Sequence, residues 1–207
     1  MQRIKRIFIG LLAAVVVTAC VREIDDQTDT TKTAGATTAA ASTPVQPVQP
    51  AMSIEVDVAT RQLRVFRNGA PAETYQVAVG TSEWPTKPGS WTITQVVWNP
   101  DWVPPDESWA KDETRKESGA RDNPLGQVQL VYDPPRTIHG TNEPASIGKA
   151  ASHGSIRMRN ADAVALAKVV MAAGGAQKDD AWVADAQRNR TQKQVVDLPQ
   201  PVPIVVK

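Results

Sequence analysis

Residues 138–166 read IHGTNEPASIGKAASHGSIRMRNADAVAL. The stretch opens with a short strand-like run that ends at His139, and it closes with an apolar helical pattern that follows Asn160. Between the two lies Ser-His-Gly-Ser (residues 152–155), whose small residues suit a tight loop. The only two histidines of the chain, His139 and His153, both precede a glycine. The stretch therefore predicts a strand, a loop and a helix that bring candidate catalytic groups together.

Runs of alternating apolar and polar residues predict a mainly β domain around this stretch. Asn68–Gly69 is a turn signal between two of these runs, and it predicts a β-meander. The C-terminal run, residues 194–207, is extended and interrupted by prolines, which predicts an edge strand. The other predicted strands cover residues 53–58, 62–69, 72–80, 90–99, 127–132 and 136–140.

One substantial helix is predicted after the Ser-His-Gly-Ser loop. Asn160 is expected to cap its N-terminus and Gly174 to end it. Residues 99–109, NPDWVPPDESW, are expected to lack regular structure because prolines remove donors and restrict their neighbours. The fold class expected is mainly β with this one main α-helix. The apolar stripe of the helix consists of Val164, Leu166, Ala167, Val170 and Met171.

Composition limits the classes of partner. The 207 residues include 23 Lys and Arg against 22 Asp and Glu, so the net charge of +1 gives no electrostatic case for nucleic acid. The lone cysteine, Cys20, excludes an intramolecular disulfide. Four of the six tryptophans cluster in sequence, which predicts either a groove wall or a core cluster: Trp84, Trp91, Trp98 and Trp102.

Residues 1–19 have the organisation of a secretory signal peptide, with basic residues followed by an apolar run too short to span a bilayer comfortably. The VTAC sequence that ends at Cys20 resembles a bacterial lipobox, in which the cysteine receives lipid and tethers the protein to a membrane surface. Ordinary cleavage after Ala19 is the alternative. Residues 20–51, rich in Thr, Ala, Pro and Gln, predict a disordered tether, which leaves residues 52–207 as the folded domain.

The two histidines favour nucleophilic catalysis over metal binding. A zinc site needs three or four ligands, and the chain has no HExxH pattern, so no metal and no cofactor are expected. A histidine base at a strand end and a nucleophile just before a helix can converge across a turn, where helix N–H groups would stabilise a developing anion. Two structural histidines that each donate to a carbonyl are an equally open alternative.

The composite pattern resembles the L,D-transpeptidase catalytic domain family, also called YkuD-like. The family signature has a histidine, an intervening stretch, and then Ser/Thr-His-Gly-Cys followed by Arg or Asn. Two further segments, GTSEWPTKPGSWTI and NPLGQVQLVY, also resemble family sequences, and the resemblance covers nearly all of residues 53–207. It implies the family's β-sandwich with a helix and a lid-like excursion. The residues that match the signature are His139, Ser152, His153, Gly154 and Arg157.

The resemblance implies acyl transfer on peptidoglycan stem peptides outside the cytoplasmic membrane. The family nucleophile cleaves a tetrapeptide stem before its terminal D-Ala, forms an acyl-enzyme, and passes the acyl group to an amine. By position, His139 is the base and Ser155 holds the nucleophile position. His153 and Gly154 shape the loop, and Arg157 orients a substrate carboxylate or peptide carbonyl.

Ser155 stands where the family has cysteine, and this difference leaves two hypotheses open. A serine hydroxyl must lose its proton during attack, so it depends more on its base than a thiol does. The first hypothesis is an enzyme that uses Ser155 to cross-link or trim stems. The second is a catalytically silent domain that binds peptidoglycan or a partner enzyme. In either case Tyr132 and the tryptophans of residues 84–102 are expected to line the substrate groove.

Overall fold

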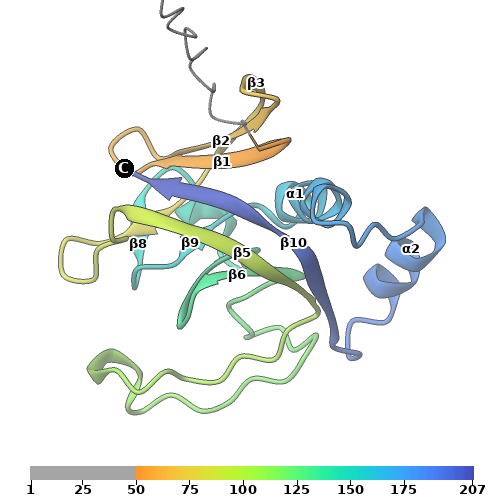
Figure 1. Cartoon of the computed structure of the whole chain (residues 1–207). Coiled ribbons are helices and arrows are strands. Elements are labelled where there is room, and N and C mark those ends of the chain that lie inside the picture. The colour runs from red at the N-terminus through yellow and green to blue at the C-terminus, as the bar shows by residue number, and fades with distance from the viewer. Residues whose placement is uncertain (1–49) are drawn as a thin grey trace, which may run out of the picture. The chain divides into compact units, whose positions relative to one another are not determined.

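An eight-stranded sheet frames residues 50–207, the part of the chain that the computed structural model describes. The strand order is β3-β2-β1-β10-β5-β6-β7-β9, and a small second sheet pairs β4 with β8. The large sheet curls on itself (Figure 1). The strands are β1 (Met52–Asp57), β2 (Gln62–Arg67), β3 (Ala70–Gln76), β4 (Val79–Gly80), β5 (Gly89–Trp98), β6 (Val128–Asp133), β7 (Arg136–His139), β8 (Ala150–Ser152), β9 (Ile156–Arg157) and β10 (Gln194–Val206).

The predicted mainly β class with one main helix is confirmed by this architecture. The predicted meander is also present, because β1, β2 and β3 pair antiparallel in chain order. Asn68 and Gly69 form the turn between β2 and β3 with positive φ angles of 49° and 79°. The predicted signal peptide, Cys20 and residues 20–49 of the predicted tether lie outside the described residues.

Strand β10 lies inside the sheet, so the predicted edge strand is wrong. It pairs parallel with β1 at Ile204–Val206, and it pairs antiparallel with β5 along both of its halves. The pairing with β5 is interrupted between Asp197 and Val202, and Pro199 and Pro201 lie within that irregularity. An interior strand tolerates prolines at a bulge because the ladder requires no N–H donor there.

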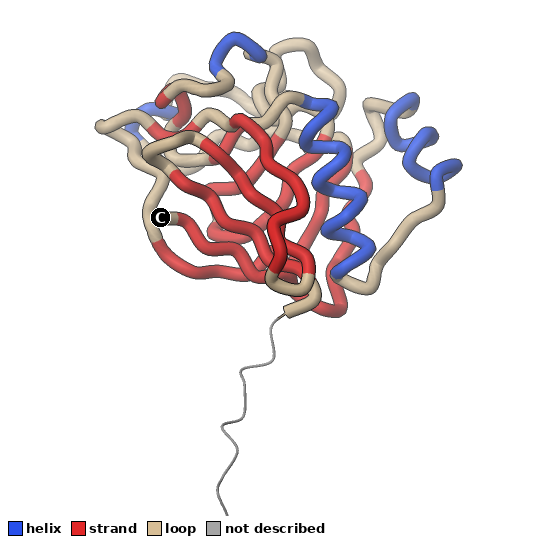
Figure 2. The backbone as a smooth tube through the Cα atoms, turned by 90° about the horizontal axis from the view of Figure 1, so that it is seen from above, coloured by secondary structure: helices blue, strands red, loops and turns tan. Residues whose placement is uncertain are grey.

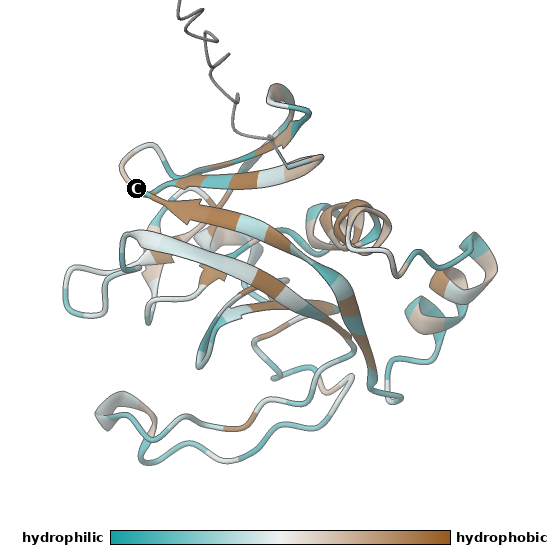
Figure 3. Ribbon diagram, viewed as in Figure 1, coloured by the Kyte–Doolittle hydropathy of each residue, from teal (hydrophilic) through white to brown (hydrophobic). Residues whose placement is uncertain are grey.

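The core follows from the two-residue period of the strands, whose inward positions are buried. Each fully buried aliphatic side chain of this kind contributes about 1.5–3 kcal/mol. Figure 3 shows these positions as brown bands on the strands, whereas the segment between β5 and β6 is mostly teal to white. The fully or almost fully buried strand residues include Ile54, Val56, Leu63, Val65, Ile93, Val96, Leu130, Ile138, Ile156 and Ile204.

The main helix, α1 (Asn160–Ala173), packs against β6, β7 and β10 and lies alongside the sheet (Figure 2). All five residues of the predicted apolar stripe are buried, and Gly174 follows the last helical residue as predicted. The predicted N-cap is wrong, because Asn160 is the first helical residue and Arg159 occupies the cap position without a side-chain cap. The helix therefore begins without using the Asn160 amide, which has other partners described below.

A second helix, α2 (Asp180–Arg188), was not predicted. Its N-cap is Asp179, whose carboxylate accepts a hydrogen bond of 2.7 Å from the backbone N–H of Trp182. Within residues 50–207, neither helix has the length and apolar character needed to cross a membrane.

Residues 99–127 form a long excursion between β5 and β6, with two legs that run side by side (Figure 1). Trp102 and Lys116 join the legs through two backbone hydrogen bonds of 2.8 and 2.9 Å. Its only helical turn is the short 3₁₀ helix Ser108–Ala110, as expected for a segment rich in proline. We refer to residues 99–127 as the lid.

Candidate active site

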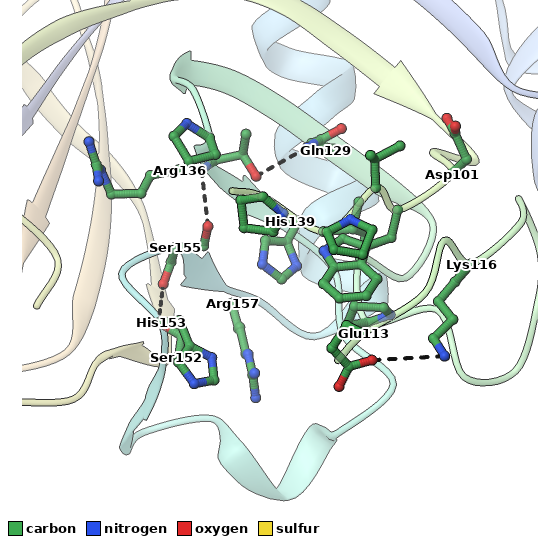
Figure 4. A pocket seen from close by; sticks show the side chains of 18 of the residues that line it. Asp101, Glu113, Lys116, Gln129, Arg136, His139, Ser152, His153, Ser155 and Arg157 are labelled. Atoms are coloured by element: carbon green, nitrogen blue, oxygen red, sulfur yellow. Dashed lines mark hydrogen bonds and ion pairs between the residues drawn. The ribbon is translucent and has the colours of Figure 1, made fainter. Parts of the chain in front are cut away.

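Strand β7 and the 152–155 loop meet because β7 pairs parallel with β9, the strand that follows the loop. Ile138 pairs with Ile156 and His139 with Arg157. Just before this ladder, the backbone N–H of Thr137 donates a 3.2 Å hydrogen bond to Ser155 Oγ. A cavity of about 660 Å³ opens there, between the sheet and the lid (Figure 4). Its lining includes His139, Ser152, His153, Ser155 and Arg157.

His139 is a buried, neutral imidazole. Its Nδ1 lies 2.6 Å from the carbonyl oxygen of Gly140. Because a carbonyl only accepts, Nδ1 carries the proton and Nε2 keeps its lone pair. Burial and, to a lesser extent, the Arg157 charge lower the pKa of His139 to about 4, against the opposing effect of the Gly140 carbonyl. The ring is thus held in the tautomer and charge state that a general base requires.

The 152–155 loop is fixed by hydrogen bonds to its own backbone and to Thr86. The Ser152 hydroxyl donates to the carbonyl of Ser155, and the Thr86 hydroxyl donates to the carbonyl of Gly154 at 3.0 Å. Gly154 adopts a φ of +99°, and a Cβ at this position would press on Arg136 and Pro85. The loop therefore needs glycine at residue 154 to present Ser155 to the cavity.

Arg157 supplies the positive charge that acts on His139. Its Nη1 forms a 2.7 Å ion pair with Glu143 Oε2. The Arg157 side chain is 14% exposed, whereas that of Glu143 is 64% exposed. A substrate carboxylate that reached Arg157 would therefore have to compete with an exposed carboxylate.

The lid contacts the active-site loop through aromatic rings. Trp109 stacks on His153 with a centroid distance of 4.0 Å and an interplanar angle of 8°. Trp102 stacks in turn on Trp109, with ring centroids 6.3 Å apart and an interplanar angle of 28°. The Trp109 indole N–H donates to Glu107 at 2.7 Å, which fixes the ring within the lid. These contacts hold the lid against the active-site loop, and residues of both line the cavity.

The groups around Ser155 can stabilise a negative charge. Within residues 50–207, the backbone N–H groups of Gly154 and Ser155 donate no hydrogen bond to another backbone group, so they remain available to an oxyanion. The expected contribution of the helix N-terminus is not found at this point. Strand β9 separates Ser155 from α1, and the N–H that reaches Ser155 Oγ belongs to Thr137.

The sequence profile of the L,D-transpeptidase catalytic domain (YkuD) matches residues 51–198. The chain belongs to the L,D-transpeptidase catalytic domain family. YqjB of Bacillus subtilis (strain 168), which bears the name L,D-transpeptidase, is 31% identical over 121 residues, or 56% of this chain and 64% of that protein. YkuD of the same strain, also named an L,D-transpeptidase, is 34% identical over 118 residues, or 56% of this chain and 59% of that protein. The chain therefore spans less than two thirds of the length of these curated relatives.

Solved structures of the family resemble the domain at lower identity. An L,D-transpeptidase from Mycobacterium smegmatis is 17% identical with a TM-score of 0.48, over 76% of this chain and 58% of that chain. One from Stackebrandtia nassauensis is 16% identical with a TM-score of 0.44, over 78% of this chain and 58% of that chain.

Tyr132 does not line the cavity, so this part of the predicted groove is wrong. It is buried in the core, where its ring packs edge-on against Trp91 at 5.6 Å. Alternation along β6 places Tyr132 on the same face as Val128 and Leu130, both fully buried. The alternation of apolar residues at 128, 130 and 132 in the sequence could therefore have predicted that Tyr132 is buried in the core.

The other clustered tryptophans divide between core and cavity. Trp98 is fully buried and packs against Trp182 of α2. Trp102 lines the cavity as predicted. Trp84 lies beside His153, with ring centroids 6.2 Å apart, in a smaller neighbouring cavity. The cluster therefore divides: Trp91 and Trp98 pack in or against the core, whereas Trp84 and Trp102 line cavities.

Sequence reasoning missed four side chains that shape the site: Thr86, Trp109, Glu143 and Asn160. Each acts through a contact between segments distant in the chain, for which a single sequence carries no pattern. Trp109 had a partial signal, because it is the last residue of the proline-rich run 99–109 that is expected to be irregular.

Proposed function

We propose that residues 50–207 catalyse acyl transfer on peptidoglycan stem peptides, with Ser155 as the nucleophile and His139 as the general base. The observation that carries this proposal is the convergence of the two residues on one cavity, in a chain that belongs to the L,D-transpeptidase family. Because β7 pairs parallel with β9, the end of β7 at His139 lies beside the loop that precedes β9 and contains Ser155.

In the proposed reaction, Ser155 Oγ attacks the carbonyl that precedes the terminal D-Ala of a tetrapeptide stem. His139 Nε2 takes the hydroxyl proton and returns it to the D-Ala amine as the C–N bond breaks. The backbone N–H groups of Gly154 and Ser155 hold the oxyanion. The ester intermediate then passes its acyl group to an acceptor amine, which gives a cross-link, or to water, which gives a trimmed stem.

The remaining signature residues have supporting roles in this proposal. Ser152, His153 and Gly154 shape the loop, and Arg157 binds a carboxylate or peptide carbonyl of the stem. The leader pattern of residues 1–19 and the VTAC sequence support export and lipid attachment at Cys20. We therefore place the enzyme in the bacterial cell envelope, anchored to a membrane and facing the periplasm or cell wall.

The alternative is a catalytically silent domain that binds peptidoglycan or regulates a partner enzyme. One observation favours it: within residues 50–207, Ser155 Oγ accepts a hydrogen bond from the Thr137 N–H and makes none to His139. A serine that donates to no base is a poor nucleophile at neutral pH.

The test is incubation of the purified protein with disaccharide-tetrapeptide muropeptides, followed by mass spectrometry. We expect a cross-linked dimer or a trimmed tripeptide stem, lost in Ser155→Ala and retained in Ser90→Ala, which removes an exposed serine on β5. Binding to purified sacculi without product from the wild-type protein would favour the silent domain. Absence of both binding and product would refute the enzyme and the peptidoglycan-binding domain, and would leave only regulation of a partner enzyme.

A further inference from the structure

The amide of Asn160 joins three segments that are far apart in sequence. Its Oδ1 accepts a 3.1 Å hydrogen bond from the N–H of Gln127, which immediately precedes β6. Its Nδ2 donates at 2.9 Å to the carbonyl of Thr141, two residues beyond the end of β7. Since Asn160 itself starts α1, one side chain fastens the helix to the two strands beside the cavity.

Two glycines make room for this amide. A Cβ at Gly126 or at Gly140 would overlap Asn160 Oδ1. Gly126 also has a φ of +66°, which disfavours any other residue. Gly140 lacks that constraint, and two of the three atoms that a Cβ there would approach most closely belong to Asn160. The side chain of Asn160 is thus the main reason why residue 140 must be glycine.

The clamped segment is the one that fixes His139. The carbonyl of Gly140 accepts the proton on His139 Nδ1, and the N–H of Gly140 donates to Val128 at 2.9 Å. Asn160 holds the next carbonyl along the chain, that of Thr141. The Gly140–Thr141 peptide that carries the acceptor for His139 is therefore fixed on both sides.

We propose that Asn160 is a positioning residue, which fixes the tautomer and orientation of His139 by clamping the Gly140–Thr141 peptide. This proposal rests on the proposed function for the role of His139 as a base, but the contact itself exists independently of turnover. Loss of the clamp frees the Gly140 carbonyl to rotate, admits water to the ring, and leaves the direction of Nε2 unfixed.

The chain suits a direct test by NMR, because it has only two histidines. A spectrum of His153→Gln assigns the signals of His139. In Asn160→Ala, we expect the pKa of His139 to rise by roughly one unit or more as water reaches the ring. We also expect a mixture of the two neutral tautomers, with the proton on Nδ1 in one and on Nε2 in the other. With turnover measured in the same variants, kcat should fall by roughly 100-fold, since small misplacements have effects of that size, with little change in KM.

Asn99→Gly is the matched control. The Asn99 amide is also a buried clamp, which donates to the carbonyls of Ala186, Asn189 and Gln192. Asn99 is the first residue of the lid, and its backbone N–H, which glycine retains, donates to the Gln127 carbonyl at 2.7 Å. Its side-chain amide, however, bonds to neither His139 nor the Gly140–Thr141 peptide, and glycine suits its φ of 49°. We expect this variant to lose stability while the pKa and tautomer of His139 stay as in the wild type.

A double-mutant cycle provides a second test. Gly140→Ala should displace Asn160 and raise the pKa of His139 much as Asn160→Ala does. In the Asn160→Ala background, however, Gly140→Ala should add little, because the atom that it would strike is gone.

Additive effects in this cycle, or an unchanged His139 pKa and tautomer in folded Asn160→Ala, would overturn the proposal. The NMR measurements decide this even if no variant turns over muropeptides. A failure of the proposed function would instead appear as absent product together with an intact dependence of His139 on Asn160.

Discussion

Acidification below pH 6.5 is expected to destabilise the domain through His139. Burial and the Arg157 charge hold the pKa of His139 at about 4 in the folded protein, against 6.5 in the unfolded chain. Between these values the unfolded state binds a proton that the folded state excludes. The stabilising contribution is therefore complete above pH 6.5, and it is lost progressively as the pH falls toward 4.

The expected magnitude is a large part of the stability of a domain. One pKa unit corresponds to about 1.4 kcal/mol, so the interval between 6.5 and about 4 corresponds to about 3 kcal/mol. The free energy of unfolding of a typical domain is only about 5–15 kcal/mol.

Urea denaturation at several pH values between 7.5 and 4 measures this term. His153 must first be replaced by Gln, because burial also lowers its pKa and gives a contribution of the same sign. Two proteins are then compared, His153→Gln alone and His153→Gln with His139→Gln. Between pH 7.5 and 4, the free energy of unfolding should fall by about 3 kcal/mol more in the protein that keeps His139. Carboxylates titrate equally in both proteins and cancel. Equal pH dependences would refute the buried, neutral state of His139.

Three further predictions concern the surroundings of the site. Glu143→Gln frees Arg157 from an exposed ion pair worth about 0–1 kcal/mol. The KM for stems with a free carboxylate should therefore fall by up to about fivefold. Added salt should erase this difference from the wild type. Trp109→Ala removes the stack on the active-site loop, worth about 0.5–1.5 kcal/mol, and limited proteolysis within the lid should become several-fold faster. Thr86→Val leaves the Gly154 carbonyl without its donor, which should cost about 1–3 kcal/mol in thermal unfolding, with recovery in Thr86→Ser.

The elements that the sequence predicted well are those whose residues contact their neighbours in the chain. The β1–β3 meander has alternating strands and an Asn-Gly turn, and α1 has a continuous apolar stripe. Strands β8 and β9 are only three and two residues long, so their periodicity cannot be seen. Their existence depends on pairing with β4 and β7, which is a property of the assembled fold.

The errors at β10 and Asn160 have related causes. Proline predicts an edge strand by a local rule, but a bulge at Pro199 and Pro201 removes the conflict for these two of the three prolines of β10, while Pro203 pairs with Thr92. Asparagine before a helix predicts an N-cap by a local rule, but the amide of Asn160 finds partners at Gln127 and Thr141 instead. In both cases contacts between distant segments decide the outcome. The match of His139, His153 and Arg157 to a known signature placed them at one site with Ser155, which stands at the position of the family cysteine; spacing alone left this open.

The identity of residue 155 determines how well this site can work. A base with a pKa of about 4 is reliably neutral at pH 7, but it is a weak acceptor for a proton as tightly held as that of a serine hydroxyl. A thiol ionises near pH 8.5 and loses its proton more readily to the same imidazole. The N–H of Thr137, which lies 3.2 Å from Ser155 Oγ, would also strengthen its hydrogen bond to a charged sulfur. These groups therefore suit a nucleophile more acidic than serine, and turnover of muropeptides should rise, rather than fall, in Ser155→Cys.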